Sequence, residues 1–171
     1  MLRTPDTIST LRDVLTQCRT IAVVGLSPQW HRPSHFAAKY MQAHGYRIVP
    51  VNPLVARDGG LILGEVAYAS VEEAAQAIAR QGGRIDMVDC FRKSEDIPPL
   101  AEEAIAVGAR CLWLQLGVFN DAAGQRAEAA GLQVIQNRCV KIEHARLFGG
   151  LGWMGVNTRV ISAKRLRQLP Y

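Results

Sequence analysis

Short apolar runs rich in β-branched residues alternate with helical patterns along most of this chain. Continuous apolar runs of that length suit strands that are covered on both faces, as in a parallel sheet. The expected strands are residues 21–25, 46–51, 85–91, 111–115 and 132–136. Because the strands alternate with helices and no repeat is visible, the pattern predicts a doubly wound α/β fold.

The helical patterns carry their own start and stop signals. We expect helices at 6–18, 34–44, from Val71 onward, from Ile97 onward and at 121–130, with Asp6, Ser34, Ser70 and Asn120 as capping residues. Four of the helices run into glycine, at Gly45, Gly82, Gly108 and Gly131. The prediction is therefore a Rossmann-like, mostly parallel sheet of about five strands with helices on both faces.

The length and the charge narrow the possibilities further. The 171 residues suffice for one ordinary domain and fall short of the roughly 250 that an eight-unit barrel needs. We expect a single ligand-binding domain at 1–148, opening with an N-terminal helix at 1–18, and an irregular tail at 149–171 packed on it. The net charge of +5 is spread over the chain, which speaks against a nucleic-acid partner.

The lack of a recognisable targeting signal and the spacing of the cysteines lead us to expect a cytoplasmic protein. No apolar run approaches the roughly 18 residues that span a bilayer, so no membrane association is expected. The first residues lack the layout of a secretory signal. The four cysteines are widely separated, without zinc-type spacing, and are expected as free thiols.

In an open parallel sheet, ligands bind where the strands end. The first strand is followed by Gly25, which permits a tight turn, and by the hydroxyl group of Ser27. The next helix, opening near Ser34, points free N–H groups at this loop, and Arg32 adds a formal charge. The loop is neither the G-x-G-x-x-G fingerprint nor a Walker A loop. It predicts an anion site of an unspecified kind.

The end of the second strand carries Asn52 and Pro53, where an NAD-binding domain usually has an acidic residue for the ribose hydroxyls. The nearby charged residue is Arg57, whose positive charge would attract an additional ribose phosphate. This arrangement favours CoA or NADP over NAD. Further basic residues follow the later strands, and we expect Arg92, Arg138 and Lys141 to gather at the same edge.

Candidates for catalysis are few. His35 is expected to pack or to form a hydrogen bond, and Glu143 and His144 to form a local structural contact. Cys139 lies near two basic residues that could lower its pKa and make the thiol reactive, although a buried structural cysteine is the simpler interpretation.

Ordered blocks over residues 15–150 resemble the small bacterial CoA-binding proteins, which are similar to the CoA-binding domain of the succinyl-CoA synthetase alpha chain. The blocks are IAVVGLSPQWHRPSHFAAKYMQAHGYRIVPVNP, ILGEVAYASVEEA, IDMVDCFRKSEDIPPLAEEAI, WLQLGV and NRCVKIEHARL. The resemblance does not extend to the phosphohistidine domain of the synthetase, and His144 has no matching context. Synthetase activity is therefore not implied.

The resemblance implies particular binding residues. Gly25, Leu26 and Ser27 would form the loop near the diphosphate, with Arg32 and Ser34 beside it, and Asn52 and Pro53 would stand at the adenosine end. The loops after the next two strands would contribute Phe91, Arg92, Gln115 and Leu116. Asn137 and Cys139 are similar to the Asn-x-Cys segment of the synthetase.

We therefore expect a protein that binds CoA or an acyl-CoA at the carboxyl edge of the sheet, with no evident catalytic machinery. An NADP-dependent enzyme, a thiol enzyme using Cys139 and an acyl-CoA-sensing regulatory subunit are the alternatives. A protein partner or self-association stays open.

Overall fold

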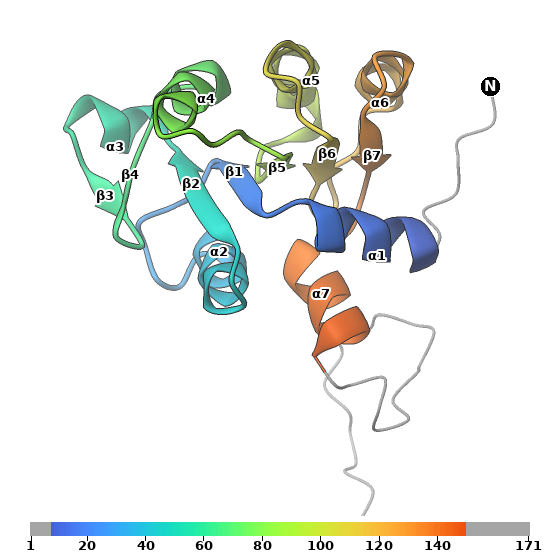
Figure 1. Cartoon of the computed structure of the whole chain (residues 1–171), viewed down its shortest axis with the longest axis horizontal. Helices are drawn as coiled ribbons and strands as arrows, with labels where there is room; N and C mark the ends of the chain where they lie inside the picture. Colours follow the sequence, from blue (N-terminus) through green and yellow to red (C-terminus); the bar gives the residue numbers. More distant parts are fainter. Residues whose placement is uncertain (1–7, 150–171) are drawn as a thin grey trace, which may run out of the picture.

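The computed structural model describes residues 8–149, and within them a five-stranded parallel sheet is covered by helices on both faces (Figure 1). In spatial order the strands are β2 (Arg47–Val51), β1 (Thr20–Val24), β5 (Met87–Cys90), β6 (Cys111–Leu114) and β7 (Gln133–Ile135). All four pairings are parallel. The predicted doubly wound, Rossmann-like α/β fold is confirmed.

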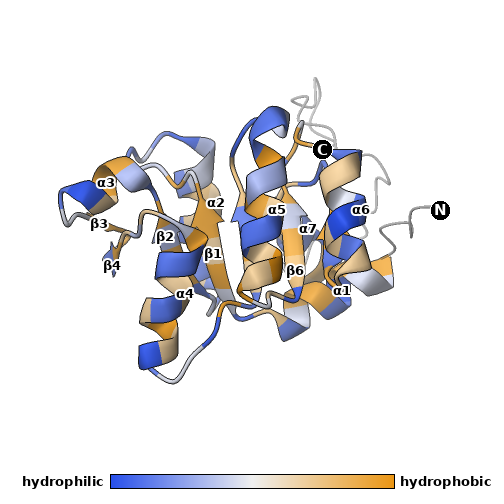
Figure 2. Ribbon diagram, turned by 90° about the horizontal axis from the view of Figure 1, so that it is seen from above, coloured by the Kyte–Doolittle hydropathy of each residue, from blue (hydrophilic) through white to orange (hydrophobic). Residues whose placement is uncertain are grey.

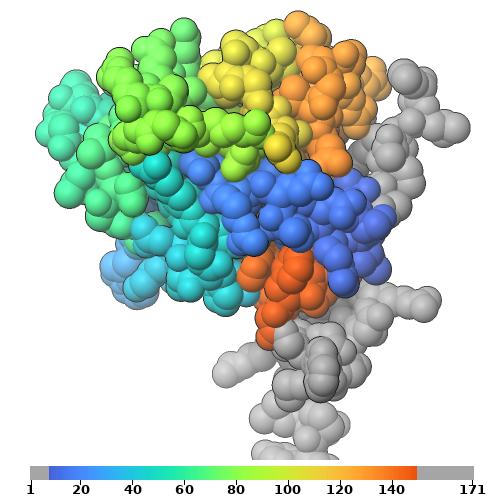
Figure 3. Space-filling model, in the orientation of Figure 1, coloured from blue at the N-terminus to red at the C-terminus, as the bar shows by residue number. Residues whose placement is uncertain are grey.

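Six helices form the two outer layers. One layer contains α4 (Val71–Arg80), α5 (Ile97–Ala106) and α6 (Asp121–Ala129), and the other contains α1 (Ile8–Gln17), α2 (Pro33–Ala43) and α7 (Val140–Phe148). In the space-filling view, the green, yellow and orange helices lie directly against the blue and cyan segments beneath them (Figure 3). The sheet is thus the middle of three layers.

Alternation along each strand divides the core into two clusters. In β1, Ala22 and Val24 face the cluster under α4, α5 and α6, whereas Ile21 and Val23 face the cluster on the opposite side. The strands are the apolar, orange centre of the molecule, between helices that are blue on their outer sides (Figure 2). Burial on both faces explains why these strands are continuous apolar runs.

The connection after β2 contains structure that the sequence pattern did not predict. This connection begins with the short helix α3 (Pro53–Arg57), and a two-stranded hairpin follows as β3 (Leu61–Ile62) and β4 (Glu65–Val66). Tyr68 then forms a single parallel bridge to Val51, on the side of β2 that faces away from β1. This bridge occupies the place of the third strand in the 3-2-1-4-5-6 order of Rossmann domains.

The chain therefore reverses direction across the sheet. From the Tyr68 side of β2 it returns through α4 to β5, on the far side of β1. The reversal leaves a crevice between the carboxyl ends of β1 and β5, and such switch points are where ligands bind in open α/β sheets.

Most of the predicted helix signals are confirmed. Ser70 Oγ accepts the Glu73 N–H at 3.1 Å and Asn120 Oδ1 accepts the Ala123 N–H at 3.0 Å. All four glycines that were expected to end helices have positive φ angles. Ser34 is not a capping residue, because α2 begins one residue earlier, at Pro33, with Arg32 in the N-cap position. Asp6 and the tail at 150–171 lie outside the described residues.

Helix α7 was not predicted from the sequence. It places Glu143, with no exposed surface, between Arg138 and Arg146, at N–O distances of 3.2 and 2.5 Å. His144 contacts the α2 residue Tyr40, with 3.1 Å between Nδ1 and the hydroxyl oxygen. The expected contact between Glu143 and His144 is therefore wrong: Glu143 pairs with two arginines, and His144 contacts Tyr40.

Candidate ligand-binding site

Two adjoining cavities open at the carboxyl edge of the sheet, at the switch point. The first, here called the α4–α5 cavity, measures about 600 Å³ and lies between the ends of β1 and β2 and the starts of α4 and α5. The second, here called the loop cavity, measures about 760 Å³ and lies between the β1–α2 loop and the segments after β5 and β6. Cavities of this size hold small molecules and cofactors.

Ten of the eleven residues predicted for binding line one cavity or both. They are Gly25, Ser27, Arg32, Ser34, Asn52, Pro53, Phe91, Arg92, Gln115 and Leu116. Leu26 lines neither cavity: its side chain is fully buried in the core beside α1 and α2. Any contact of Leu26 with a ligand would come from its main chain.

Gly25 stands where the two cavities meet. Its φ angle is +81°, and its N–H donates to the Val51 carbonyl oxygen at 2.9 Å. A Cβ atom at this position would lie 2.5 Å from the Phe91 carbonyl oxygen. Since a side chain here would be strained and would collide with backbone, glycine keeps the ends of β1 and β5 close together.

Hydrogen bonds fix the shape of the β1–α2 loop. The buried Ser34 Oγ accepts the Ser27 N–H at 3.0 Å, and Ser27 Oγ accepts the Gln29 N–H at 3.1 Å. His35 Nδ1 lies 3.0 Å from the Ser27 carbonyl oxygen, which confirms the expectation of a structural hydrogen bond. Both serine hydroxyls thus already hold the loop in place.

Positive charge surrounds the loop cavity. Its charged residues are Arg32, Arg92, Lys93 and Asp96, so three cations face one carboxylate. Arg32 is exposed at the N-cap of α2 and its Nε donates to Gln29 Oε1 at 3.2 Å. Because a helix N-terminus also carries partial positive charge, this cavity is suited to an anion.

Asn52 ties together the ends of β1 and β2. Its Oδ1 accepts the N–H groups of Leu54 and Val55, which caps α3, and its Nδ2 donates to the Leu26 carbonyl oxygen at 2.9 Å. An aspartate here would face that carbonyl oxygen with a second acceptor. Asn52 therefore stands where an NAD-binding domain has an acidic residue, and its amide is needed there because both its oxygen and its nitrogen form hydrogen bonds.

The α4–α5 cavity has an acidic side that sequence reasoning missed. Glu95, Asp96 and Glu103 line it, together with the apolar Val24, Val51, Leu54 and Leu100. Asp96 pairs with Arg92 at 3.4 Å, and Glu103 accepts the Val71 N–H at 2.9 Å. The two cavities thus differ in charge, and the signal for this was the acidic pair Glu95 and Asp96 that follows the basic residues after β5.

A buried acid behind the loop cavity was also missed. The Asp89 side chain is 2% exposed, and its Oδ1 accepts a hydrogen bond from Gln115 Nε2 at 2.7 Å. Burial raises the pKa of Asp89 to about 7, against a smaller lowering by the Gln115 hydrogen bond. The signal in the sequence was an acidic residue inside an otherwise apolar strand.

Three of the expected basic residues do not line the cavities. Arg57 pairs with Asp58 at 3.4 Å, and Arg138 pairs with Glu143. Lys141 places its Nζ 5.8 Å from the centre of the Tyr40 ring. The last two follow the carboxyl end of β7, as expected, but their contacts with α7 and Tyr40 keep them out of the cavities that Arg32 and Arg92 line.

The cysteines behave as structural residues. Cys18, Cys90 and Cys111 are buried, and Cys139 is partly buried at the start of α7. Burial raises the pKa of Cys139, which favours the expected structural cysteine over the alternative of a reactive thiol with a lowered pKa. Among residues 8–149, no group of three His, Cys, Asp or Glu side chains could hold a metal ion.

The fold, the glycine turn and the basic cavity define a Rossmann-like domain with a site for an anionic ligand. Residues 19–145 match the family model described as a CoA binding domain, and the chain belongs to that family. No helix in the described part of the chain is long and apolar enough to cross a membrane.

Relatives cover most of the chain. An uncharacterized Bacillus subtilis protein, YneT, is 38% identical over 135 residues, which are 79% of this chain and 92% of that protein. A hypothetical protein from Pyrococcus horikoshii is 35% identical with a TM-score of 0.75, over 87% of this chain and 99% of that one. A Thermus thermophilus protein is 31% identical with a TM-score of 0.71, over 83% and 99%.

Proposed function

We propose that this protein binds coenzyme A or an acyl-CoA at the carboxyl edge of its sheet and carries out no reaction on it. The observation that carries the proposal is the loop cavity, where a glycine turn, a helix N-terminus and an excess of cations converge. Membership of the CoA binding domain family supports the same ligand class.

The charge difference between the cavities suggests how the ligand lies. The diphosphate would sit against the Gly25–Ser27 turn, within reach of Arg32 and Arg92. The adenosine end would lie by Asn52 and Pro53, where the α4–α5 cavity offers apolar walls. Anionic groups are favoured in the basic cavity and disfavoured beside Glu95 and Glu103, so the adenine ring would enter the α4–α5 cavity with the ribose phosphate of CoA turned away from these two acids.

The pantetheine arm would run past the segment after β6. Gln115 lines the loop cavity there, and Leu116 and Phe119 expose more than half of their surfaces. Asn137 Oδ1 accepts the Gly117 N–H at 2.8 Å and so holds this segment to the end of β7. An arm with alternating amide and methylene groups would meet matching polar and apolar surface.

We propose further that residues 1–148 act as one ligand-binding domain in the cytoplasm, with a small molecule as the principal partner. The three buried cysteines form no disulfide, which suits a reducing compartment. The raised pKa of Cys139 favours a binding role over a thiol enzyme.

Titration calorimetry with CoA, dephospho-CoA, NAD and NADP tests the proposal. We expect CoA to bind at least about tenfold more tightly than either dinucleotide. Tighter binding of NADP would favour the oxidoreductase alternative, and the absence of binding by CoA would reject the proposal. Native mass spectrometry of the purified protein adds an independent test, since CoA retained from the cell would appear as a bound mass.

A further inference from the structure

Asp89 and Gln115 form a buried polar pair immediately behind the wall of the loop cavity. Asp89 lies on β5 between Val23 of β1 and Trp113 of β6, the residues at the same level in the neighbouring strands. Gln115 follows β6, is 4% exposed and reaches the loop cavity. The pair therefore connects an acid in the core to the surface that would meet a ligand.

The protonation state of the acid determines which way the amide of Gln115 faces. An ionised carboxylate only accepts hydrogen bonds, so it holds the Gln115 Nε2 group and leaves Oε1 for the opposite side. A protonated carboxyl can donate its O–H to Oε1, which lets the amide turn over and release its NH₂ group. The two states thus offer a ligand an acceptor or a donor.

We propose that Asp89 is a positioning residue for ligand binding, whose proton turns the Gln115 amide and tightens the binding of an anionic CoA-type ligand. This inference rests on the proposed function and specifies how its site responds to pH. In the protonated state the site gains an N–H donor for carbonyl or phosphate oxygens, and it loses a buried negative charge.

The sign follows from both effects. An anionic ligand is repelled by the carboxylate of Asp89 and attracted by a free NH₂ group of Gln115, so it binds the protonated protein better. Binding should therefore tighten as the pH falls, and ligand binding should in turn promote uptake of a proton. The raised pKa of Asp89, about 7, sets the range in which the change occurs.

Other titratable groups near Asp89 do not compete with it in this range. The thiol of Cys139 faces it from the start of α7, and burial raises the pKa of that thiol further. Cys90, the next residue on β5, faces the opposite core cluster, and its pKa is also raised by burial. The remaining charged or titratable groups of the packed elements contact other groups: Glu143 pairs with Arg138 and Arg146, and Arg92 pairs with Asp96. Lys141 lies by the Tyr40 ring, and His35 of α2 contacts the Ser27 carbonyl oxygen.

The test measures affinity against pH in the wild-type protein and in Asp89→Asn, with CoA and dephospho-CoA. Both ligands are needed because the additional phosphate of CoA titrates near pH 6 by itself. We expect the wild-type protein to bind dephospho-CoA about fivefold more tightly at about pH 6 than at about pH 8. Asp89→Asn should bind equally at both, at the level of the acidic wild-type protein.

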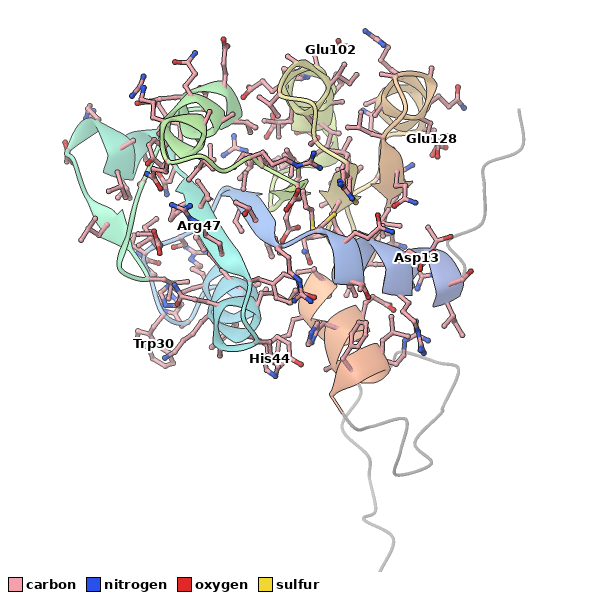
Figure 4. The ribbon with its side chains drawn as sticks, viewed as in Figure 1. Asp13, Trp30, His44, Arg47, Glu102 and Glu128 are labelled. Carbon is pink, nitrogen blue, oxygen red and sulfur yellow. The ribbon has the colours of Figure 1, made fainter. Side chains whose placement is uncertain are left out.

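Asp13→Asn is the matched control, since it removes one exposed carboxylate from α1, outside both cavities (Figure 4). It should keep the wild-type pH dependence. An Asp89→Asn protein that retains the wild-type slope would overturn the inference, as would a wild-type protein with no slope for dephospho-CoA.

A direct measurement keeps the inference testable even if Asp89→Asn does not fold. NMR of the unmodified protein without ligand should show the Asp89 carboxyl carbon and the Gln115 side-chain NH₂ signals shifting together near pH 7. Signals that stay constant from about pH 5 to about pH 9 would reject it. Failure of CoA to bind at any pH would instead reject the proposed function. The NMR titration would then still show whether the proton of Asp89 turns the Gln115 amide.

Discussion

The carbonyl oxygen of Phe91 lies 2.5 Å from the position that a Cβ atom on Gly25 would occupy. This closeness joins the ends of β1 and β5, the two strands at which the chain reverses its path across the sheet. The residue that makes the fold possible at this point therefore also shapes the wall shared by both cavities.

Replacing Gly25 by alanine should damage both stability and binding. The positive φ angle alone costs about 1 kcal/mol, and the collision with Phe91 adds to it. Gly45→Ala is the matched control, because Gly45 has a φ of +87° and nothing within 4 Å of its Cβ position. Urea unfolding and calorimetry should show a loss of stability in both variants and a loss of CoA affinity in Gly25→Ala alone. Equal affinities would separate Gly25 from the site.

Reversing the charge of Arg32 should weaken CoA binding by at least about tenfold, because a phosphate contact becomes a repulsion. The control is Lys39→Glu, which makes the same change of charge at an exposed position on α2 outside the cavities. Calorimetry at two salt concentrations should show a weaker salt dependence in Arg32→Glu only. Unchanged affinity would remove Arg32 from the site.

Cys139→Ser should keep CoA affinity within about threefold of the wild-type value, since the residue lines neither cavity. Burial raises the pKa of Cys139, so its alkylation at neutral pH should also be slower than that of a free thiol. Mass spectrometry after timed exposure to iodoacetamide checks this rate. Rapid, selective modification of Cys139 would restore the thiol-enzyme alternative.

His144 should make the protein less stable in mild acid. Burial, with the nearby His44 and Arg19, lowers the pKa of His144 below its usual 6.5, so the unfolded chain binds the proton more readily. His44 lies where α2 faces α7 (Figure 4). The stabilisation is present above about pH 6.5 and is lost as the pH falls below that value.

His144→Gln tests this dependence by urea unfolding at about pH 7.5 and about pH 5.5. It should reduce the difference in unfolding free energy between the two conditions. His31→Gln, a change at an exposed histidine of the β1–α2 loop, should leave the difference as it is. A wild-type protein equally stable at both pH values would contradict the prediction.

Local pattern sufficed for the sheet, and together with the family resemblance it predicted most of the cavity lining. Runs such as Ile21–Val24 are buried on both faces, and burial of that kind leaves a direct trace in the sequence. The residues after each strand then follow from the topology, because parallel strands end at one edge. For this reason the residues predicted after the first two strands meet at two adjoining cavities, whereas Phe91, Gln115 and Leu116, which join them there, were implied by the family resemblance.

What local pattern missed depends on distant partners. Helix α7 buries Glu143 and His144, which look like a solvent-facing side until their partners on other segments are known. Asp89 and Gln115 are 26 residues apart and meet only through strand pairing. Helix α3 is five residues long and carries too little periodicity to be seen.

The single bridge at Tyr68 also affects what the outer border of the sheet can offer to another chain. Tyr68 donates its N–H to Pro50 O and accepts the Asn52 N–H, so Pro50 turns its ring nitrogen toward the outer border of the sheet. That border accordingly lacks a donor where a neighbouring molecule would need one. A second chain that paired with β2 at this position would form one hydrogen bond fewer, which disfavours the intermolecular β-pairing that starts aggregates.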